Sequence, residues 1–234
     1  MLRPLGTAVA ATALLTAPAF AQDVISTPGE AIMASFDIVR TQVKSQGSDV
    51  VFRVQVRGKA GEMKPKAVGQ FAGSAVWSYV WPTSLDSAGV GFDSGQGILA
   101  LAVTFHPDFD DAAYGGVNRH VWHPHWVVLV PDDACGKGAL KVRDIPAGTK
   151  PKVPATWPGV PLLIDSPTYP TTLGGDTVEV KVPAEVIGAV EGVKFDGVTS
   201  ALKVNANLHA PLLCISDIFD VASGDLSLPG RIAR

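Results

Sequence analysis

The chain has 234 residues, and its 19 Lys and Arg against 22 Asp and Glu give a formal net charge of −3 at pH 7. A charge this close to neutral offers no strongly basic surface for nucleic acid or an anionic membrane, so we expect neither partner. The 24 glycines and 18 prolines disfavour long helices and favour short strands joined by turns.

Residues 1–21 have the pattern of an export signal. Arg3 supplies the positive start, residues 8–15 the apolar core, and Ala19-Phe20-Ala21 the small-x-small cleavage site. The apolar run is too short to span a membrane as a helix. We therefore expect a cleaved signal peptide and a periplasmic or secreted protein that begins near Gln22.

The first elements after this signal differ in how clearly they are specified. In the N-terminal segment 22–48, the apolar residues Ile32, Phe36, Val39 and Val43 have a period near 3.6, which fits a short helix or an entry strand. Residues 49–57, DVVFRVQVR, alternate along the chain. Val50, Phe52, Val54 and Val56 point to one face, and Val51, Arg53, Gln55 and Arg57 point to the other. This alternation predicts a half-buried strand.

Seven further segments have the length and composition of strands and are separated by turn-forming residues. One of them, 98–105 (ILALAVTF), is apolar throughout, which predicts burial on both faces. The others are residues 71–81, 127–130, 140–143, 176–182, 192–208 and 212–221. Short strands at this spacing predict an all-β fold, a single antiparallel β-sandwich over residues 49–234 with long loops and at most short helices.

The two cysteines, Cys135 and Cys214, have no CxxC spacing. In an oxidising compartment such a pair predicts one structural disulfide. A pair of thiolate metal ligands is the alternative. The disulfide would close a loop of roughly 80 residues, for which chain-entropy models predict about 4 kcal/mol of stabilisation.

Residues 106–126 concentrate the unusual chemistry of the chain. Four of the five histidines fall in this segment together with three aspartates, and these residues are His106, His120, His123, His125, Asp108, Asp110 and Asp111. Imidazole and carboxylate groups are borderline-to-hard ligands that suit a divalent transition metal. The segment therefore predicts a metal site.

His123 and His125 form the pair best suited to bind one ion. On an extended strand they point to the same face, about 7 Å apart along the backbone. Pro124 between them favours an edge strand or a bulge. His106 ends the preceding strand and becomes a third ligand if that strand pairs with residues 121–130. His209 follows a distant strand and is the other candidate ligand.

Five neighbouring residues are candidates for orienting the imidazoles without binding the ion themselves. They are His120, Asp108, Asp110, Asp111 and Trp122. His120 has the opposite parity to the histidine pair, so it joins them only through a bulge or turn. The alternative is that the aspartates are solvated loop charges and that Trp122 is part of a hydrophobic wall.

Copper is the metal that the sequence favours, with zinc as the alternative. A blue-copper centre needs a Cys ligand followed by a His, together with a Met, and no histidine follows Cys214. Only Met33 and Met63 remain after the predicted signal, too few for a methionine-rich Cu(I) site. A multi-histidine site for copper or zinc remains, and export to the periplasm favours copper.

The run at residues 122–129, WHPHWVVL, places aromatic side chains beside histidines in an exported β protein. In this it resembles the surface copper-binding proteins of methanotrophs, the MopE/CorA type. The resemblance covers this motif and the general scaffold, and it implies ligation of copper by His123 and His125. That family also uses an oxidised tryptophan in a Trp-x-His spacing. His123 directly follows Trp122 here, so the tryptophan modification is not carried over.

Three functions from different classes fit these residues. We favour an exported metal-binding protein that catalyses no reaction, because no nucleophile or general-base constellation accompanies the histidines. A zinc-dependent hydratase or hydrolase is the second, with three histidines on the ion and water in the fourth position. The third is an exported binding module whose histidines line a surface without metal.

Overall fold

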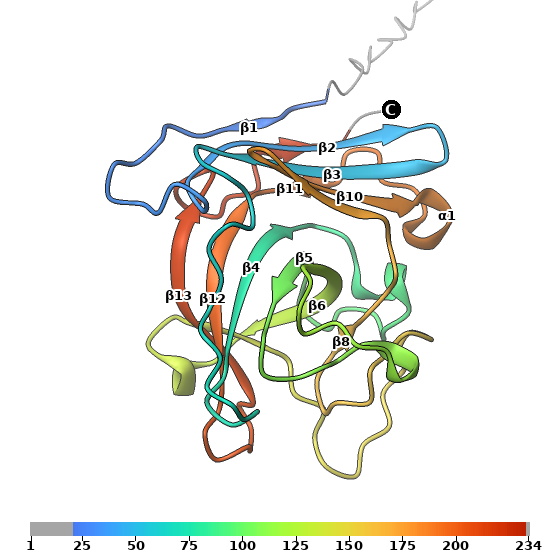
Figure 1. Ribbon diagram of the computed structural model, residues 1–234. Coiled ribbons are helices and arrows are strands. Elements are labelled where there is room, and N and C mark those ends of the chain that lie inside the picture. The colour runs from blue at the N-terminus through green and yellow to red at the C-terminus, as the bar shows by residue number, and fades with distance from the viewer. Residues whose placement is uncertain (1–20, 233–234) are drawn as a thin grey trace, which may run out of the picture.

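Two antiparallel β-sheets dominate the computed structural model, which describes residues 21–232 (Figure 1). The first sheet is open and has the order β1-β2-β3-β10-β9. Its strands are β1 (Val24–Ile25), β2 (Ile38–Gln46), β3 (Asp49–Val56), β10 (Thr177–Pro183) and β9 (Thr171–Gly174). The alternating segment that predicts a half-buried strand is β3, which lies at the centre of this sheet.

The second sheet closes on itself. Its order is β5-β4-β12-β13-β7-β6-β8, and β5 also pairs with β6, so that all strands but β8 form a closed, barrel-like ring. The strands are β4 (Ala75–Pro82), β5 (Ile98–Phe105), β6 (His123–Pro131), β7 (Leu140–Val142), β8 (Ile164–Asp165), β12 (Val198–Val204) and β13 (Leu213–Val221). We call the interior of this ring the lumen.

The remaining elements are short. A two-stranded ribbon pairs β11 (Lys194–Phe195) with β14 (Gly230–Arg231). One α-helical turn, α1 (Ala184–Ile187), follows β10 directly. The three 3-10 turns are η1 (Ser87–Val90), η2 (Ala113–Gly115) and η3 (Asp133–Cys135).

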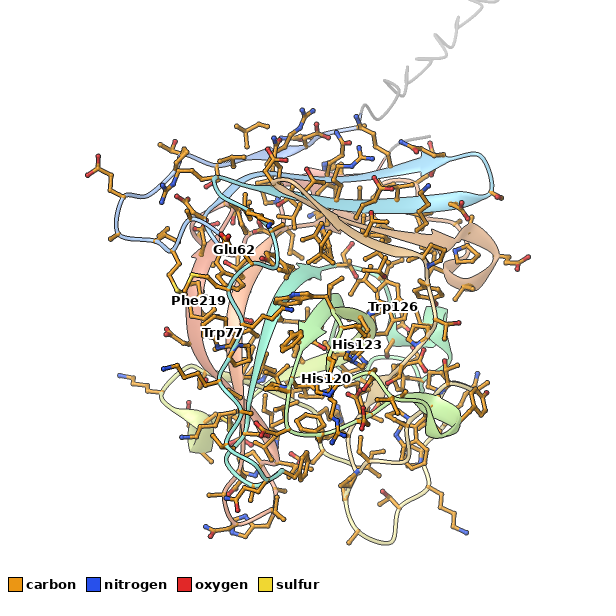
Figure 2. All side chains as sticks on the ribbon, viewed as in Figure 1. Glu62, Trp77, His120, His123, Trp126 and Phe219 are labelled. Atoms are coloured by element: carbon orange, nitrogen blue, oxygen red, sulfur yellow. A yellow bond between two sulfur atoms is a disulfide. The ribbon has the colours of Figure 1, made fainter. Side chains whose placement is uncertain are left out.

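Strand β5 faces two separate hydrophobic cores, which is why it is apolar throughout. Successive side chains of a strand point to opposite faces. Leu99 and Leu101 accordingly belong to the core between the two sheets, whereas Ala100 and Ala102 belong to the core inside the lumen. The first core holds large aromatic residues such as Trp126, whose ring meets Phe52 of β3 edge-on at 5.9 Å (Figure 2).

The prediction of an antiparallel all-β fold is confirmed, but the sandwich is not. The β5–β6 pairing runs from Ile98↔Leu129 to Thr104↔His123 and joins the two ends of the second sheet. Closure of this kind removes the free edges that a sheet of a sandwich retains. The structure is therefore an open sheet packed against a closed one.

The N-terminal segment contains a strand, not a helix. Strand β2 pairs with β3 along its length, with a register shift between Ile38 and Arg40. The predicted signal peptide spans residues 1–21, and all of it except Ala21 lies outside the described part of the chain. Among residues 21–232, no helix is both long and apolar enough to cross a membrane.

The predicted disulfide between Cys135 and Cys214 is confirmed. Their Cα atoms lie 5.4 Å apart, and the bond joins positions separated by 79 residues. Cys214 lies on β13 and pairs with Lys141 of β7, while Cys135 ends the η3 turn just before β7. The disulfide thus reinforces the place where β7 meets β13.

Candidate metal centre

The β5–β6 pairing brings three histidines to one end of the lumen. His123 lies opposite Thr104 and His125 opposite Ala102, so both imidazoles take the lumen side of β6. His106 follows β5 directly and therefore emerges at the same end. Pro124 lies opposite Val103, which belongs to the core between the sheets, so it points away from the lumen.

The loop between β5 and β6 carries a carboxylate to the same place. Its two flanking aspartates hold the backbone: Asp108 accepts hydrogen bonds from the N–H groups of residues 68 and 69, and Asp110 from those of residues 118 and 119. The side chain of Asn118 accepts from the N–H of Asp111 and donates to its Oδ1 at 2.7 Å. The loop therefore presents Asp111 in one orientation.

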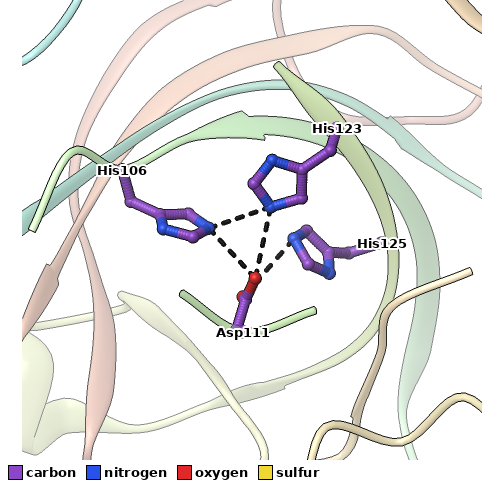
Figure 3. Close-up of side chains that lie close together, drawn as sticks. All are labelled: His106, Asp111, His123 and His125. Atoms are coloured by element: carbon purple, nitrogen blue, oxygen red, sulfur yellow. Dashed lines mark hydrogen bonds and ion pairs between the residues drawn. The ribbon is translucent and has the colours of Figure 1, made fainter. Parts of the chain in front are cut away.

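Four donor atoms converge on a common point (Figure 3). The Nε2 atoms of His106 and His123 are 3.0 Å apart, and they lie 3.3 and 3.2 Å from Oδ1 of Asp111. Nε2 of His125 lies 3.5 Å from Oδ2 of the same carboxylate. Ligands about 2.0–2.1 Å from one tetrahedral ion are roughly 3.3–3.4 Å from each other. These four separations are close to that value, and one donor atom from each residue lies within 4.8 Å of the others, so the group can close around a single ion.

The other nitrogen of each ring contacts a backbone carbonyl. Nδ1 of His106 is 2.9 Å from the oxygen of Phe109, and Nδ1 of His123 is 2.9 Å from that of Val121. Nδ1 of His125 is 3.0 Å from the oxygen of Asp165. A carbonyl can only accept, so each Nδ1 carries a proton, and in the neutral ring Nε2 then presents a lone pair to the centre. This tautomer is the one that binds a metal through Nε2.

The convergent lone pairs need a cation. When Nδ1 carries the proton in both rings, the Nε2 atoms of His106 and His123 are two acceptors facing each other at 3.0 Å. Nε2 of His125 is buried and makes no hydrogen bond. An added proton can relieve one such contact, but a metal ion at the centre satisfies all three nitrogens and the carboxylate together.

Burial and charge set the protonation states of the site. Burial lowers the pKa of His125 to about 3, although the adjacent Asp111 carboxylate opposes the shift. Burial alone would raise the pKa of Asp111, but the imidazoles in their protonated form, His125 first, outweigh burial as the pH falls and hold this pKa well below its usual value. At neutral pH, His125 is neutral and Asp111 ionised, which are the states that metal ligands require.

Of the four histidines named as ligands, the structure brings together His106, His123 and His125. His209 lies apart from them in the exposed turn between β12 and β13, where its side chain and carbonyl contact Asn205. His209 was a candidate because it follows a strand, and the fold decides whether that strand end reaches the other histidines. The turn instead carries His209 away into solvent.

The residues expected to orient the imidazoles have different positions. Asp111 is itself one of the four donors, and among three neighbouring aspartates the sequence has no signal that singles it out. Asp108 and Asp110 brace the loop and touch none of the rings, and His120 is exposed (Figure 2). Trp122 packs against Tyr79 and Phe105 as a hydrophobic wall and donates a hydrogen bond to the carbonyl of Gly61.

No protein-family model, curated protein or solved structure matches this chain. The chemistry of the site therefore rests on its own residues. A buried group of three imidazoles and one carboxylate, with all donor atoms within 4.8 Å of one another, can hold a metal ion.

Proposed function

We propose that this protein is an exported metal-binding protein whose ion is held by His106, His123, His125 and Asp111. The observation that carries the proposal is the shared orientation of the three rings, each of which directs Nε2 inward while its Nδ1 contacts a backbone carbonyl. Without a cation to bind, three neutral imidazoles arranged in this way, two of them fully buried, would have lone pairs that face one another with little access to water.

Copper(II) is the ion we expect to bind most tightly. Nitrogen and oxygen donor sets follow the Irving–Williams order, in which copper(II) exceeds the other divalent first-row metals, including zinc. No cysteine or methionine is among the donors, so the site does not select Cu(I) by softness. Resemblance of residues 122–129 to the methanotroph copper-binding proteins supports the same metal.

Export is part of the proposal. Residues 1–21 have the order of charge, apolar core and small residues that a cleaved signal has. The disulfide between Cys135 and Cys214 suits an oxidising compartment such as the periplasm. A net charge near neutral and no strongly basic surface argue for a metal ion, rather than nucleic acid, as the partner.

Metal content tests the proposal directly. We expect purified protein, loaded with copper or zinc and then dialysed, to retain about one ion per chain by elemental analysis. His123→Ala and Asp111→Asn should abolish retention, while His120→Ala and His209→Ala, which remove the two exposed histidines, should leave it intact. Retention by all four variants, or by none including the wild type, would refute the assignment. Melting curves of the metal-free variants verify that each one folds.

Competition between the two metals tests the choice of copper. With equimolar copper(II) and zinc and a chelator buffering both, we expect copper to occupy the site. Zinc is the runner-up, because three histidines and one carboxylate complete a tetrahedral zinc site. Asp111 takes the position that a zinc hydratase or hydrolase leaves to water, so in this site any added ligand has to bind as a fifth one.

A further inference from the structure

The lumen beside the metal centre is hollow. A cavity of about 480 Å³ is lined by side chains from every strand of the closed ring, and three of the four proposed ligands, His106, Asp111 and His125, stand at its wall. The rest of the wall is largely aliphatic, for example Val76, Val80, Val127, Val198 and Leu202. A small molecule in this cavity would therefore have apolar surroundings and a metal centre at one end.

Polar atoms in the cavity wall are few, and one of them has no partner. Oγ1 of Thr104 is buried and makes no hydrogen bond. Thr104 lies opposite His123 in the β5–β6 pairing, so this hydroxyl is at the same end of the lumen as the metal centre. Ser78 and Ser200, further along, already hydrogen-bond to each other at 2.8 Å. Among these three hydroxyl groups, the one that is free to hydrogen-bond to a ligand is therefore that of Thr104, which lies beside the metal centre.

The size of the cavity limits the ligand. A cavity of about 150 Å³ in a protein core holds one benzene molecule, which has six heavy atoms. The lumen is about three times larger, which corresponds to roughly 18 heavy atoms. Its lining runs from His106 at one end to Pro82 and Val221 at the other, along the lengths of β4 and β13. An elongated chain of about ten carbons follows this shape and stays within the limit of roughly 18 heavy atoms.

The charge of the site selects the head group. At the metal end, a divalent ion held by three imidazoles and the carboxylate of Asp111 has one net positive charge. The cavity wall contains no Lys or Arg, and its other carboxylate, Asp217, is exposed. A single anionic group on the ligand would neutralise this charge by binding the metal as a further ligand. It would also accept a hydrogen bond from Oγ1 of Thr104.

The cavity also has a route to solvent. Strand β7 is only three residues long and pairs with β13 at Cys214↔Lys141 alone. Beyond this point the wall includes Asp217 and Ile218, which are exposed, Ile218 by 47 %. A ligand can therefore enter between β13 and the short β7, at some distance from the histidines.

We propose that the lumen binds a medium-chain carboxylic acid, with its carboxylate on the metal and on Thr104 and its alkyl chain along the aliphatic wall. This proposal rests on the metal site proposed above, because the anionic head has no other cation to meet in the cavity. The alkyl part depends only on the lumen. The two proposals can therefore fail separately.

Calorimetric titration with decanoate and with its neutral methyl ester tests the metal site and the apolar lumen separately. We expect decanoate to bind metal-loaded protein at least tenfold more tightly than metal-free protein, and the ester to bind both forms equally. Thr104→Val should weaken decanoate binding to the loaded protein by about tenfold, because a hydrogen bond to a charged group is lost. Decanoate that binds equally with and without metal would overturn the placement of the head group.

Filling the far part of the lumen tests the position of the chain. Val80→Phe should abolish decanoate and ester binding and leave metal retention and butyrate binding unchanged, whereas Val186→Phe on the exposed helical turn should change nothing. Should metal be retained while neither decanoate nor the ester binds to the wild type, this inference is wrong and the metal site stands. If no metal is retained but the ester binds and Val80→Phe blocks it, the metal site is wrong and only the apolar cavity remains.

Discussion

At the scale of single residues, the site depends on hydrogen bonds behind the donor atoms. Ser166 contacts two of the four proposed ligands: its Oγ donates to the carbonyl of Asp111 at 2.8 Å and lies 3.1 Å from Nδ1 of His125. Since Oγ already donates to the carbonyl, its lone pair is what faces Nδ1–H of the ring. Ser166 thereby supports both the loop carboxylate and the ring tautomer.

Replacement of Ser166 should weaken metal binding without abolishing it. Removing a group that orients a ligand typically lowers metal affinity by about 10–100-fold, so we expect this reduction for Ser166→Ala with one ion still bound at saturation. Competition titration against a chelator measures it. Ser78→Ala removes an equally buried hydroxyl that touches none of the four donors, and an equal loss in both variants would show that Ser166 has no specific role.

At the scale of elements, the strands could largely be predicted and their mutual arrangement could not. The predicted strand 98–105 is β5 residue for residue, because eight consecutive apolar or β-forming residues bounded by Gly97 and His106 leave no alternative. The predicted strand 127–130, which continues from His125, begins two residues earlier than that, at His123, and includes Pro124. Closure of the ring depends on the pairing of β5 with β6, which neither strand specifies by itself.

The two faces of the closed sheet should differ in their tolerance to truncation. Leu101 is fully buried between the sheets, so Leu101→Ala should lower the free energy of unfolding by about 2–5 kcal/mol. Leu202 of β12 faces the cavity in the lumen, where fewer atoms contact it, and Leu202→Ala should cost only about 1–2 kcal/mol. Urea unfolding compares them, and a larger cost for Leu202→Ala would contradict the hollow lumen.

A carboxylate joins the two sheets and makes their contact sensitive to pH. Oδ2 of Asp220 on β13 accepts a hydrogen bond from the N–H of Ile38 on β2 at 2.7 Å. Burial raises the pKa of Asp220, Asp37 raises it further, and the hydrogen bonds from Ile38 and Val221 oppose the shift. The folded state therefore holds the proton more tightly than the unfolded chain does.

Asp220→Asn should change the pH profile of stability in a defined direction. Because the folded pKa is raised, the wild type loses this stability as pH rises from the unfolded value of about 3.8 through the folded pKa. The asparagine variant has no such loss. The difference in unfolding free energy, variant minus wild type, should increase between pH 3.5 and pH 7; a difference that is constant with pH would contradict the raised pKa.

At the scale of the whole molecule, a short strand and a disulfide complete the closed ring. Strand β7 contributes three residues and meets β13 at one register position, so the ring is weakest there. The Cys135–Cys214 bond joins the two sides of this junction and encloses a span of 79 residues that includes β7 to β12. It restricts the unfolded chain over a third of its length.

Removal of the disulfide should therefore destabilise the whole fold. We expect Cys135→Ser with Cys214→Ser to lower the free energy of unfolding by about 2–5 kcal/mol, through greater freedom of the unfolded chain. Urea denaturation of the oxidised wild type and the double variant measures the change. The metal centre lies elsewhere on the ring, so copper retention at low temperature serves as the check that the variant still folds. A decrease in the free energy of unfolding below about 1 kcal/mol would mean that β7 is held by its neighbours alone.

The sequence by itself indicated most of the longer strands, the disulfide and, among its four candidate histidines, the three that converge, because alternation, cysteine count and histidine clustering are local properties of the chain. Tertiary structure alone decided that the second sheet closes, that Asp111 and not Asp108 or Asp110 joins the histidines, and that His209 lies apart. The reason is physical: which loop carboxylate reaches the lumen depends on hydrogen bonds between residues 68–69, 118–119 and 166 and the loop, and these partners meet only after β5 and β6 have paired.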